Sequence, residues 1–243
     1  MPRPPRAEQT ACIIIPAFQE ENAIGPVVRR AREFIPAVVV VDDGSRDRTA
    51  VEAEAAGATV LRHDRNRGKG VALNTGFTYA QQRSYHLTLT LDADGQHDPA
   101  DIPRFVDAYV RTGIPVLVGN RLAHPANMPP IRRWTNRLIS LYLSRRMGQY
   151  LPDTQCGFRL YRTDIIPFIS AVAERYAAES EILLRVAARG IRLDSIPIRL
   201  VPGHERSMVH PVRDGLRFLW MLWRYHQRPR RRADHPREPT SLP

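Results

Sequence analysis

The chain has 243 residues and a formal net charge of +11, and 43% of its residues are hydrophobic. A chain of this length and apolar content can bury a sizeable core, so an intrinsically disordered protein is excluded. The positive charge favours an anionic partner, such as nucleic acid, a phosphate-bearing small molecule or an acidic membrane surface.

Cysteine usage and the apolar runs narrow the class further. Cys12 and Cys156 are too few for a disulfide framework and have no zinc-site spacing, which is typical of a reduced, cytoplasmic protein. The first ten residues lack the apolar core of a signal peptide. The longest apolar run, 218–223, is far short of the roughly 20 residues needed to cross a bilayer. We therefore expect a soluble or peripheral membrane protein.

The ends of the chain differ from its middle. Residues 1–10 and 227–243 are rich in Pro and Arg and poor in apolar residues, which predicts a disordered tail at the start and a basic disordered tail at the end. Between them we expect a single domain, 11–226, with a first half at 11–120 and a second half at 121–226.

The first half alternates short apolar runs with helical patterns. Strands are predicted at 12–15, 38–41, 59–61, 87–91 and 116–118, and helices at 20–34, 47–56, 70–81 and 99–111. This alternation predicts an α/β fold with a Rossmann-like, mostly parallel sheet flanked by helices. Helix punctuation agrees: Ser45 and Asp98 are predicted N-caps, Pro99 occupies a first turn, and Gly57 and Gly113 follow helix ends.

The second half has a different pattern. An Arg-rich amphipathic helix is predicted at 131–147, followed by a turn-rich segment at 151–161, a helix at 179–189 and a strand at 196–200. A last amphipathic helix is predicted at 213–226. Its Trp, Leu and Arg residues fit an interfacial membrane helix, and equally a helix that packs its leucines on the core.

Acidic residues follow the strand at 87–91. Asp92 and Asp94 are two residues apart, so on an extended backbone they point to the same side. Neighbouring carboxylates need a cation, and Mg²⁺ or Mn²⁺ bound by Asp92, Asp94 and the amide of Gln96 satisfies that need. An ordinary turn is the equally weighted alternative for this DxDG sequence. A calcium EF-hand is excluded, because His97 and Pro103 stand where Gly and Glu are required.

Two further groups follow the same logic. Parallel strands bind ligands beyond their carboxyl ends, and the strand before Asp42 and Asp43 ends beside the others. These acids are either turn residues or contacts to a ribose or base. Lys69, the only lysine of the chain, lies between glycines at a helix start. It lacks the P-loop pattern but suits a phosphate or ribose edge.

Several segments together resemble family-2 glycosyltransferases of the GT-A fold. They are IIIPAFQEEN, VVVVDDGSRDRT, NRGKGVALNTGF, LDADGQHDP, GNR, DTQCGFRLYR and ESEILLRVAARG, in the family's order and spacing over roughly residues 11–225. The sequence is most similar to dolichol-phosphate mannosyltransferases and their bacterial polyprenyl-phosphate relatives. The resemblance implies an inverting, divalent-metal-dependent transfer of a hexose of mannose or glucose type from a GDP- or UDP-sugar to a polyprenyl phosphate. It places the enzyme at the inner face of a membrane.

The resemblance also implies residue roles. The donor would be contacted by Pro16, Phe18, Glu20, Asp42, Asp43, Lys69 and Asp92, and the metal and diphosphate would be held by Asp92, Asp94 and Gln96. The acceptor would be bound by Arg121, Arg132, Arg133, Asn136 and Arg206. Asn136 stands where relatives often have serine, and GHERSMVHP replaces the usual basic segment near the C-terminus.

The acceptor decides which further groups act. A lipid phosphate is already anionic and needs no general base, whereas a hydroxyl of a glycan, lipid or small molecule does. Asp153 and Glu181 are the candidate bases, and each is equally well explained as a turn or helix residue; with Asp94 and Arg121 they complete the predicted catalytic set. The arginines at 121, 132 and 133 favour an anionic acceptor.

Two non-enzymatic alternatives remain at this stage. The basic charge permits a nucleic-acid-binding protein, but aromatic residues are only 7% and are not interleaved with the arginines as single-strand binders require. A catalytically silent sugar-nucleotide-binding protein is disfavoured because the DxD sequence is intact. We therefore expect no nucleic-acid partner. The sequence leaves the oligomeric state open.

Overall fold

The computed structural model describes residues 10–124, 128–169 and 177–201. Within these ranges the strands are β1 (Ala11–Ala17), β2 (Val38–Asp42), β3 (Thr59–Arg62), β4 (Leu87–Thr90), β5 (Val116–Asn120), β6 (Arg159–Arg162) and β7 (Leu193–Pro197). The helices are α1 (Ile24–Arg32), α2 (Thr49–Ala55), α3 (Lys69–Gln82), α4 (Ile102–Thr112), α5 (Pro130–Met147), α6 (Ile166–Ile169) and α7 (Ala177–Ala188). The predicted helix at 213–226, Arg206 and, apart from Thr10, the two predicted tails lie outside the described residues.

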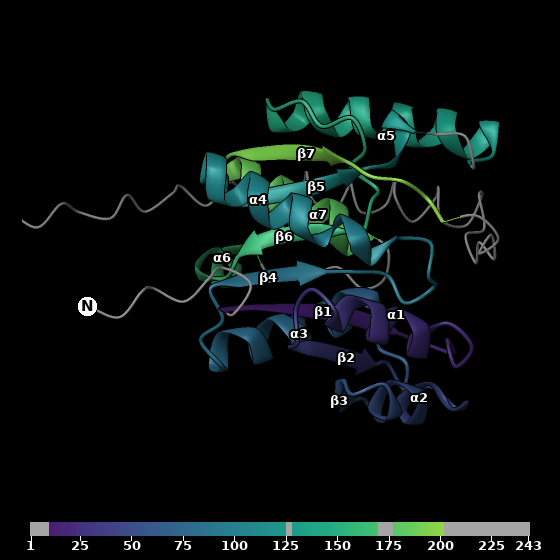
Figure 1. Cartoon of the computed structure of the whole chain (residues 1–243). Helices are drawn as coiled ribbons and strands as arrows, with labels where there is room; N and C mark the ends of the chain where they lie inside the picture. The colour runs from purple at the N-terminus through teal and green to yellow at the C-terminus, as the bar shows by residue number, and fades with distance from the viewer. Residues whose placement is uncertain (1–9, 125–127, 170–176, 202–243) are drawn as a thin grey trace, which may run out of the picture. The chain divides into compact units, whose positions relative to one another are not determined.

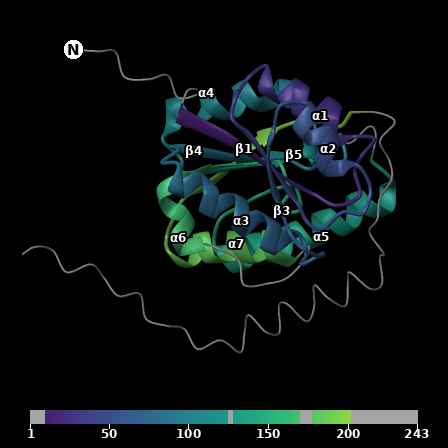
Figure 2. The same ribbon diagram turned by 90° about the horizontal axis from the view of Figure 1, so that it is seen from below.

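The strands form one sheet in the order β3-β2-β1-β4-β6-β5-β7. All neighbouring strands are parallel except β6, which is antiparallel to both β4 and β5. Helices α1, α2 and α4 cover one face of the sheet, and α3, α6 and α7 cover the other (Figure 1, Figure 2). This confirms the predicted mostly parallel α/β fold.

The central strands are buried because helices cover both of their faces. Cys12 to Ile15 in β1 and Val38 to Val41 in β2 are at most 2% exposed. Continuous apolar runs are the expected pattern of such strands. At the sheet edge, β3 is less covered, and its first and last residues, Thr59 and Arg62, are exposed.

Most predicted elements are present, with corrected boundaries. The first helix begins at Ile24 rather than at residue 20, β4 ends at Thr90, and β7 spans Leu193–Pro197 rather than 196–200. Strand β6 was missed inside the segment interpreted as turn-rich. It has four residues, and one is Arg159, a fully buried arginine that donates hydrogen bonds to backbone carbonyl oxygens.

Helix punctuation is confirmed at four of five positions. Asp98 accepts a hydrogen bond from the Ala100 amide, Pro99 occupies the first turn, and Gly57 and Gly113 have positive φ after helix ends. The Ser45 prediction is wrong because α2 begins later, at Thr49. The Ser45 amide donates to the Asp42 carboxylate and its hydroxyl accepts from the Gln19 amide, so Ser45 joins two loops instead.

Close packing of α3 on β1 requires a glycine. A Cβ on Gly76 would lie 2.4 Å from Cγ2 of the buried Ile14, far inside van der Waals contact. Helix α3 carries Lys69 at its first position, so this contact also fixes the height of Lys69 above the sheet.

We predict that Gly76→Ala lowers the free energy of unfolding by about 1–3 kcal/mol through overpacking, although alanine favours helix. Urea denaturation measures the change. The matched control is Gly25→Ala in α1, where an added Cβ meets only ordinary contacts at 3.4 Å or more; it should be neutral or stabilise by up to about 1 kcal/mol. Equal stability of the two variants would contradict this packing.

Candidate active site

The predicted site residues come from neighbouring strand ends. In the register, Ala17 of β1 lies opposite Asp42 of β2, and Ile14 lies opposite Thr90 at the end of β4. The loops that follow these strands therefore emerge at one edge of the sheet. Pro16 is the second-last residue of β1 and lies opposite Val41 of β2. This edge is where an open parallel sheet binds ligands.

Asp42 and Asp43 use their carboxylates within the protein. Asp42 is fully buried, accepts from the Ser45 amide at 3.0 Å and forms an ion pair with Arg62 at 3.2 Å. Asp43 accepts from the Gly68 amide at 2.7 Å and contacts His63 Nδ1 at 2.7 Å. These contacts fix the loops around the strand ends, as the turn interpretation expects.

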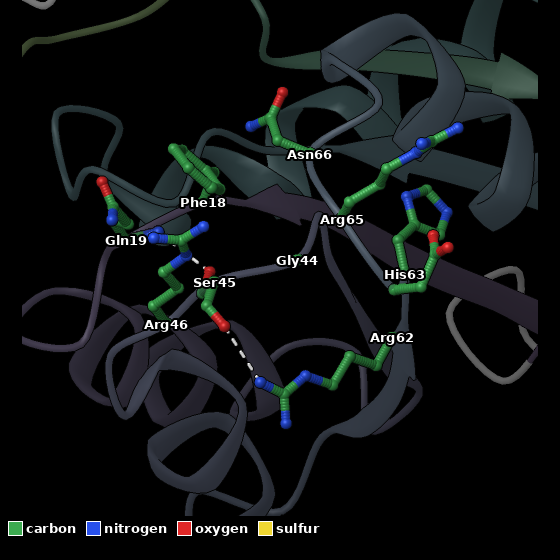
Figure 3. A pocket seen from close by; sticks show the side chains of 10 residues that line it. Phe18, Gln19, Gly44, Ser45, Arg46, Arg62, His63, Arg65 and Asn66 are labelled. Carbon is green, nitrogen blue, oxygen red and sulfur yellow. Dashed lines mark hydrogen bonds between the residues drawn. The ribbon is translucent and has the colours of Figure 1, made fainter.

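A cavity of about 750 Å³ lies beside these loops (Figure 3). Its lining comes from the loops after β1, β2 and β3: Phe18, Gln19, Gly44, Ser45, Arg46, Arg62, His63, Asp64, Arg65 and Asn66. The loops approach closely because Gly44 has φ +75° and an added Cβ would lie 2.4 Å from the Arg65 carbonyl carbon. The cavity offers an aromatic ring and several guanidinium groups to a ligand.

Lys69 contacts Asp92 and Glu179. Its Nζ lies 2.5 Å from Asp92 Oδ1 and 2.9 Å from Glu179 Oε1. Burial alone would raise the pKa of Asp92, but the charges of Lys69 and His97 lower it overall. Burial would lower the pKa of Lys69, yet the two carboxylates raise it. The lysine predicted to face the donor is the counter-ion of Asp92.

The approach to Asp92 is shaped by Gly157, just before β6. A Cβ on Gly157 would lie 2.4 Å from Asp92 Oδ1. His97 is also close, with its Nδ1 3.8 Å from Asp92 Oδ2. Its Nε2 is 3.7 Å from the Sγ of Cys156, whose pKa is raised to about 12 by burial. Cys156 is therefore an uncharged packing residue at neutral pH.

Asp94 does not extend the strand. It lies in a turn with Gly95 at φ +71°, and its Oδ1 accepts from the Gln96 amide at 3.0 Å. The premise of an extended backbone from Asp92 to Asp94 is therefore wrong. The carboxylates nevertheless interact through Glu20: burial first, then the charges of Asp94, Asp47 and Asp92, raise the pKa of Glu20 to about 7.

The described ranges alone supply only part of a metal site, and a bound substrate would have to supply the remaining oxygen ligands. Among the described residues, no three or more His, Cys, Asp or Glu side chains form a ready-made metal site. Asp92, Asp94 and Glu20 still place negative charge together, and the Gln96 side chain is buried close by in sequence. Oxygen ligands that need further oxygens from a substrate fit Mg²⁺ or Mn²⁺ bound with a diphosphate.

The residues predicted to bind the acceptor include two buried or half-buried arginines. Arg121, directly after β5, is 4% exposed and binds Asp153 through Nε at 2.8 Å and Nη2 at 3.0 Å. Burial would raise the pKa of Asp153, but the Arg121 guanidinium lowers it overall. Arg132, at the start of α5, has a pKa lowered by burial and by the charge of Arg121, while Asp94 opposes the shift.

The remaining predicted residues are placed less favourably for chemistry. Glu181 is buried on α7 and forms an ion pair with Arg185 at 2.7 Å. Asn136 is buried on the inner side of α5, and Arg133 is half-buried in the first turn of that helix. Both candidate bases, Asp153 and Glu181, are therefore paired with an arginine.

Two residues of the site were missed by sequence reasoning. Glu179 stands in the segment ESEILLRVAARG, but nothing in its spacing shows that it meets Lys69. His97 lies directly after the predicted metal motif and is 2% exposed. A histidine next to an acidic motif is only a weak sign of a site residue in the sequence, because its burial beside Asp92 is visible only in the fold.

Comparisons with known proteins decide the family. The model of "Glycosyl transferase family 2" matches residues 12–168. The chain belongs to this family. It is therefore a glycosyltransferase, as the sequence resemblance implied, and the alternative of a nucleic-acid-binding protein is not supported.

Named relatives of this glycosyltransferase include enzymes of lipid-linked sugars. Undecaprenyl-phosphate mannosyltransferase of Micrococcus luteus is 32% identical, covering 77% of this chain and 82% of the relative. UDP-N-acetylglucosamine–dolichyl-phosphate N-acetylglucosaminyltransferase of Methanococcus voltae is 28% identical, covering 80% and 87%. This confirms the predicted likeness to polyprenyl-phosphate glycosyltransferases.

Among solved structures, glucosyl-3-phosphoglycerate synthase of Mycobacterium tuberculosis, in complex with Mn²⁺, UDP-glucose and phosphoglyceric acid, has a TM-score of 0.71. The two proteins are 19% identical, and the match covers 92% of this chain and 82% of the other. The likeness confirms the predicted GT-A fold.

We predict that Asp153→Asn lowers the free energy of unfolding by about 3–5 kcal/mol at neutral pH, because it leaves Arg121 buried without its counter-charge. The pKa of Asp153 is lower in the folded state, so its contribution is full above the unfolded pKa of about 3.9 and is lost as pH falls through the folded value.

Urea denaturation of both proteins from pH 7 to acid measures this dependence. The difference in stability should be constant near neutral pH and shrink only below about pH 4. Asp164→Asn, which removes an exposed partner of Arg162, is the control and should change stability by less than about 1 kcal/mol. A stable Asp153→Asn protein would show that the pair is dispensable.

Proposed function

We propose that this glycosyltransferase moves a hexose, with inversion, from a nucleoside diphosphate sugar to a polyprenyl phosphate. The observation that carries the proposal is the arrangement of charge at the sheet edge. The carboxylates of Glu20, Asp94 and Asp92 interact electrostatically. The guanidinium group of Arg132 lies within reach of the charges of both Arg121 and Asp94.

The donor side suits a nucleotide. The cavity after β1, β2 and β3 accommodates a nucleoside, with Phe18 as an aromatic wall and backbone and side-chain polar groups around it. The diphosphate would then point toward Asp92 and Asp94. GDP- and UDP-sugars both remain donors in this proposal, because the lining offers donors and acceptors to either base.

A divalent cation completes the donor side. Mg²⁺ or Mn²⁺, held by Asp92, Asp94 and Gln96, would neutralise charge that develops on the departing nucleoside diphosphate. The excess of carboxylates around Glu20 supports this assignment. The solved structures of the mycobacterial synthase with Mn²⁺ or Mg²⁺ and UDP give the same combination in a protein of the same fold.

The acceptor side suits a phosphate. Arg132 is half-buried near Arg121, and its pKa is lowered by burial first and then by the charge of Arg121. An anion placed between the two arginines would therefore be stabilised. A phosphate acceptor attacks with an oxygen that is already anionic. The ion pairs of Asp153 with Arg121 and of Glu181 with Arg185 support this choice, because paired carboxylates are poor bases.

The reaction then needs little proton chemistry from the protein. Arg121 and Arg132 bind and orient the acceptor phosphate, and Asp153 holds the Arg121 guanidinium in place. Lys69, at the start of α3, holds Asp92 in position and also contacts Glu179 of α7. We place the reaction at the cytoplasmic face of a membrane, where a polyprenyl phosphate presents its head group. The described residues contain no helix long and apolar enough to cross a bilayer.

We predict that Asp94→Asn reduces transfer to a short-chain prenyl phosphate by about 10²–10³-fold, the effect of removing one transition-state electrostatic contact. The assay uses UDP-, GDP- and dTDP-hexoses with and without Mn²⁺, after a thermal-shift panel selects the donor that stabilises the protein. Asp164→Asn, far more exposed, is the control and should keep wild-type turnover. Full metal-independent turnover by Asp94→Asn would remove the proposal.

We predict that Arg132→Gln raises the KM for the prenyl phosphate by about 10–100-fold, the loss of one charge-assisted contact, and leaves the KM for the donor within about twofold. Arg137→Gln on the exposed side of the same helix is the control. If Arg132→Gln changes the donor KM and spares the acceptor KM, while Arg137→Gln changes neither, Arg132 belongs to the donor side. Transfer to the corresponding prenol at the rate of the phosphate would favour a hydroxyl acceptor instead.

A further inference from the structure

Helix α5 buries several polar side chains and exposes several large apolar ones. Its inner side buries Asn136, Ser140 and Ser144, and the two serines are held by hydrogen bonds to Thr154 and to the Leu151 backbone. A surface helix of a globular protein normally buries its apolar face and exposes its polar one. The inner side of α5 is instead mixed, because Leu143 and Met147 are buried beside these three polar residues, and further apolar residues are left on the outside.

The outer side carries an apolar stripe of Ile131, Trp134, Leu138 and Leu141. Their exposed fractions are 76%, 64%, 63% and 42%. Spacings of three, four and three residues place them along one face of the helix. Single exposed apolar residues are ordinary, but a contiguous row with a tryptophan marks an interaction surface. The helix lies at the outside of the sheet, packed against α7 (Figure 1).

The charges around the stripe select the partner. The sequence of α5 contains five arginines and neither aspartate nor glutamate. Arg137, Arg145 and Arg146 are exposed along the helix beside the apolar row. An apolar row flanked by arginines on one helix is the composition of a helix that lies in the plane of an anionic bilayer surface. A nucleic acid would use the arginines but would leave the apolar row in water.

The same helix reaches the acceptor side of the site. Arg132, in its first turn, is half-buried and interacts electrostatically with Arg121 and Asp94. The outer stripe starts at the adjacent Ile131. A surface that binds lipid is therefore continuous with the groups that would bind a lipid phosphate. This part of the argument rests on the proposed acceptor, whereas the stripe and its arginines do not.

We propose that α5 docks this protein on an anionic membrane surface, with the apolar stripe buried at the boundary between head groups and acyl chains. The docked helix places Arg132 at the level of the lipid phosphates. This assigns membrane contact to a segment within the domain, in addition to the predicted helix at 213–226.

The test measures binding of the full chain to vesicles by co-sedimentation. Wild-type protein should bind vesicles of equal parts phosphatidylcholine and phosphatidylglycerol, and binding should weaken with added salt and on phosphatidylcholine alone. The double variant Trp134→Glu/Leu138→Glu should partition onto vesicles at least about tenfold more weakly. Its two glutamates cannot gain the free energy that the tryptophan and leucine side chains gain on moving from water into the bilayer. The matched control is Val110→Glu, on α4, where an apolar residue is 67% exposed. It should bind like wild type.

Each remaining outcome has a defined meaning. Equal binding by the double variant and wild type overturns the proposal and moves docking to residues outside α5. A dimeric wild type that becomes monomeric in the double variant, with no vesicle binding by either, also overturns it and identifies a second copy as the occupant. Transfer to a soluble short-chain prenyl phosphate without vesicles should be unchanged in the double variant. Loss of vesicle binding with retained soluble transfer therefore separates docking from catalysis.

Discussion

The end of β4 brings more negative charge to one place than neighbouring side chains neutralise, and the architecture of the site follows from this constraint. Asp92 is balanced by Lys69, the only lysine of the chain, which reaches it from the first position of α3 and also contacts Glu179 on α7. One ammonium group thus ties two helices to the end of a strand. Burial and then the charge of Asp94 raise the pKa of Glu20 to about 7.

The basic side of the edge is built in the opposite way. Arg121 is held by Asp153 in a bidentate pair, so its direction is fixed while its charge is shared. Arg132 is less buried than Arg121. The charge of Arg121 lowers the pKa of Arg132 by more than the charge of Asp94 raises it. An anion between the two arginines and a cation among the carboxylates each remove a repulsion present in the protein alone. In the proposed reaction, a donor diphosphate with its metal and an acceptor phosphate would supply both.

Much of this arrangement could be predicted from the sequence, because local patterns determine it. The runs before Asp42 and Asp92 indicated covered parallel strands, and the topology then required their ends to meet at one edge. Asp98 and Gly113 indicated helix limits by their own conformational preferences. The seven family segments indicated the family, which the comparison confirms, whereas the donor and acceptor residues that they imply stay predictions. Helix α5 was predicted almost to its bounds.

The rest depended on contacts between distant segments. No local pattern shows that Lys69 pairs with Asp92 and Glu179, or that Asp153 serves Arg121. Strand β6 was missed because its buried Arg159 is compatible with a strand only when three backbone carbonyl oxygens converge on it. Asp92 and Asp94 were expected on an extended backbone, but a turn begins between them.

The charge imbalance at the end of β4 is tested most directly by carboxyl ¹³C NMR of Glu20 during a pH titration, assigned with Glu20→Gln. We expect a pKa of about 7 in the protein alone. Mg²⁺ with UDP or GDP should lower it, because a bound cation favours the ionised carboxylate. An ordinary glutamate pKa in the free protein, or a raised value that Mg²⁺ and the nucleotide leave unchanged, would contradict the account.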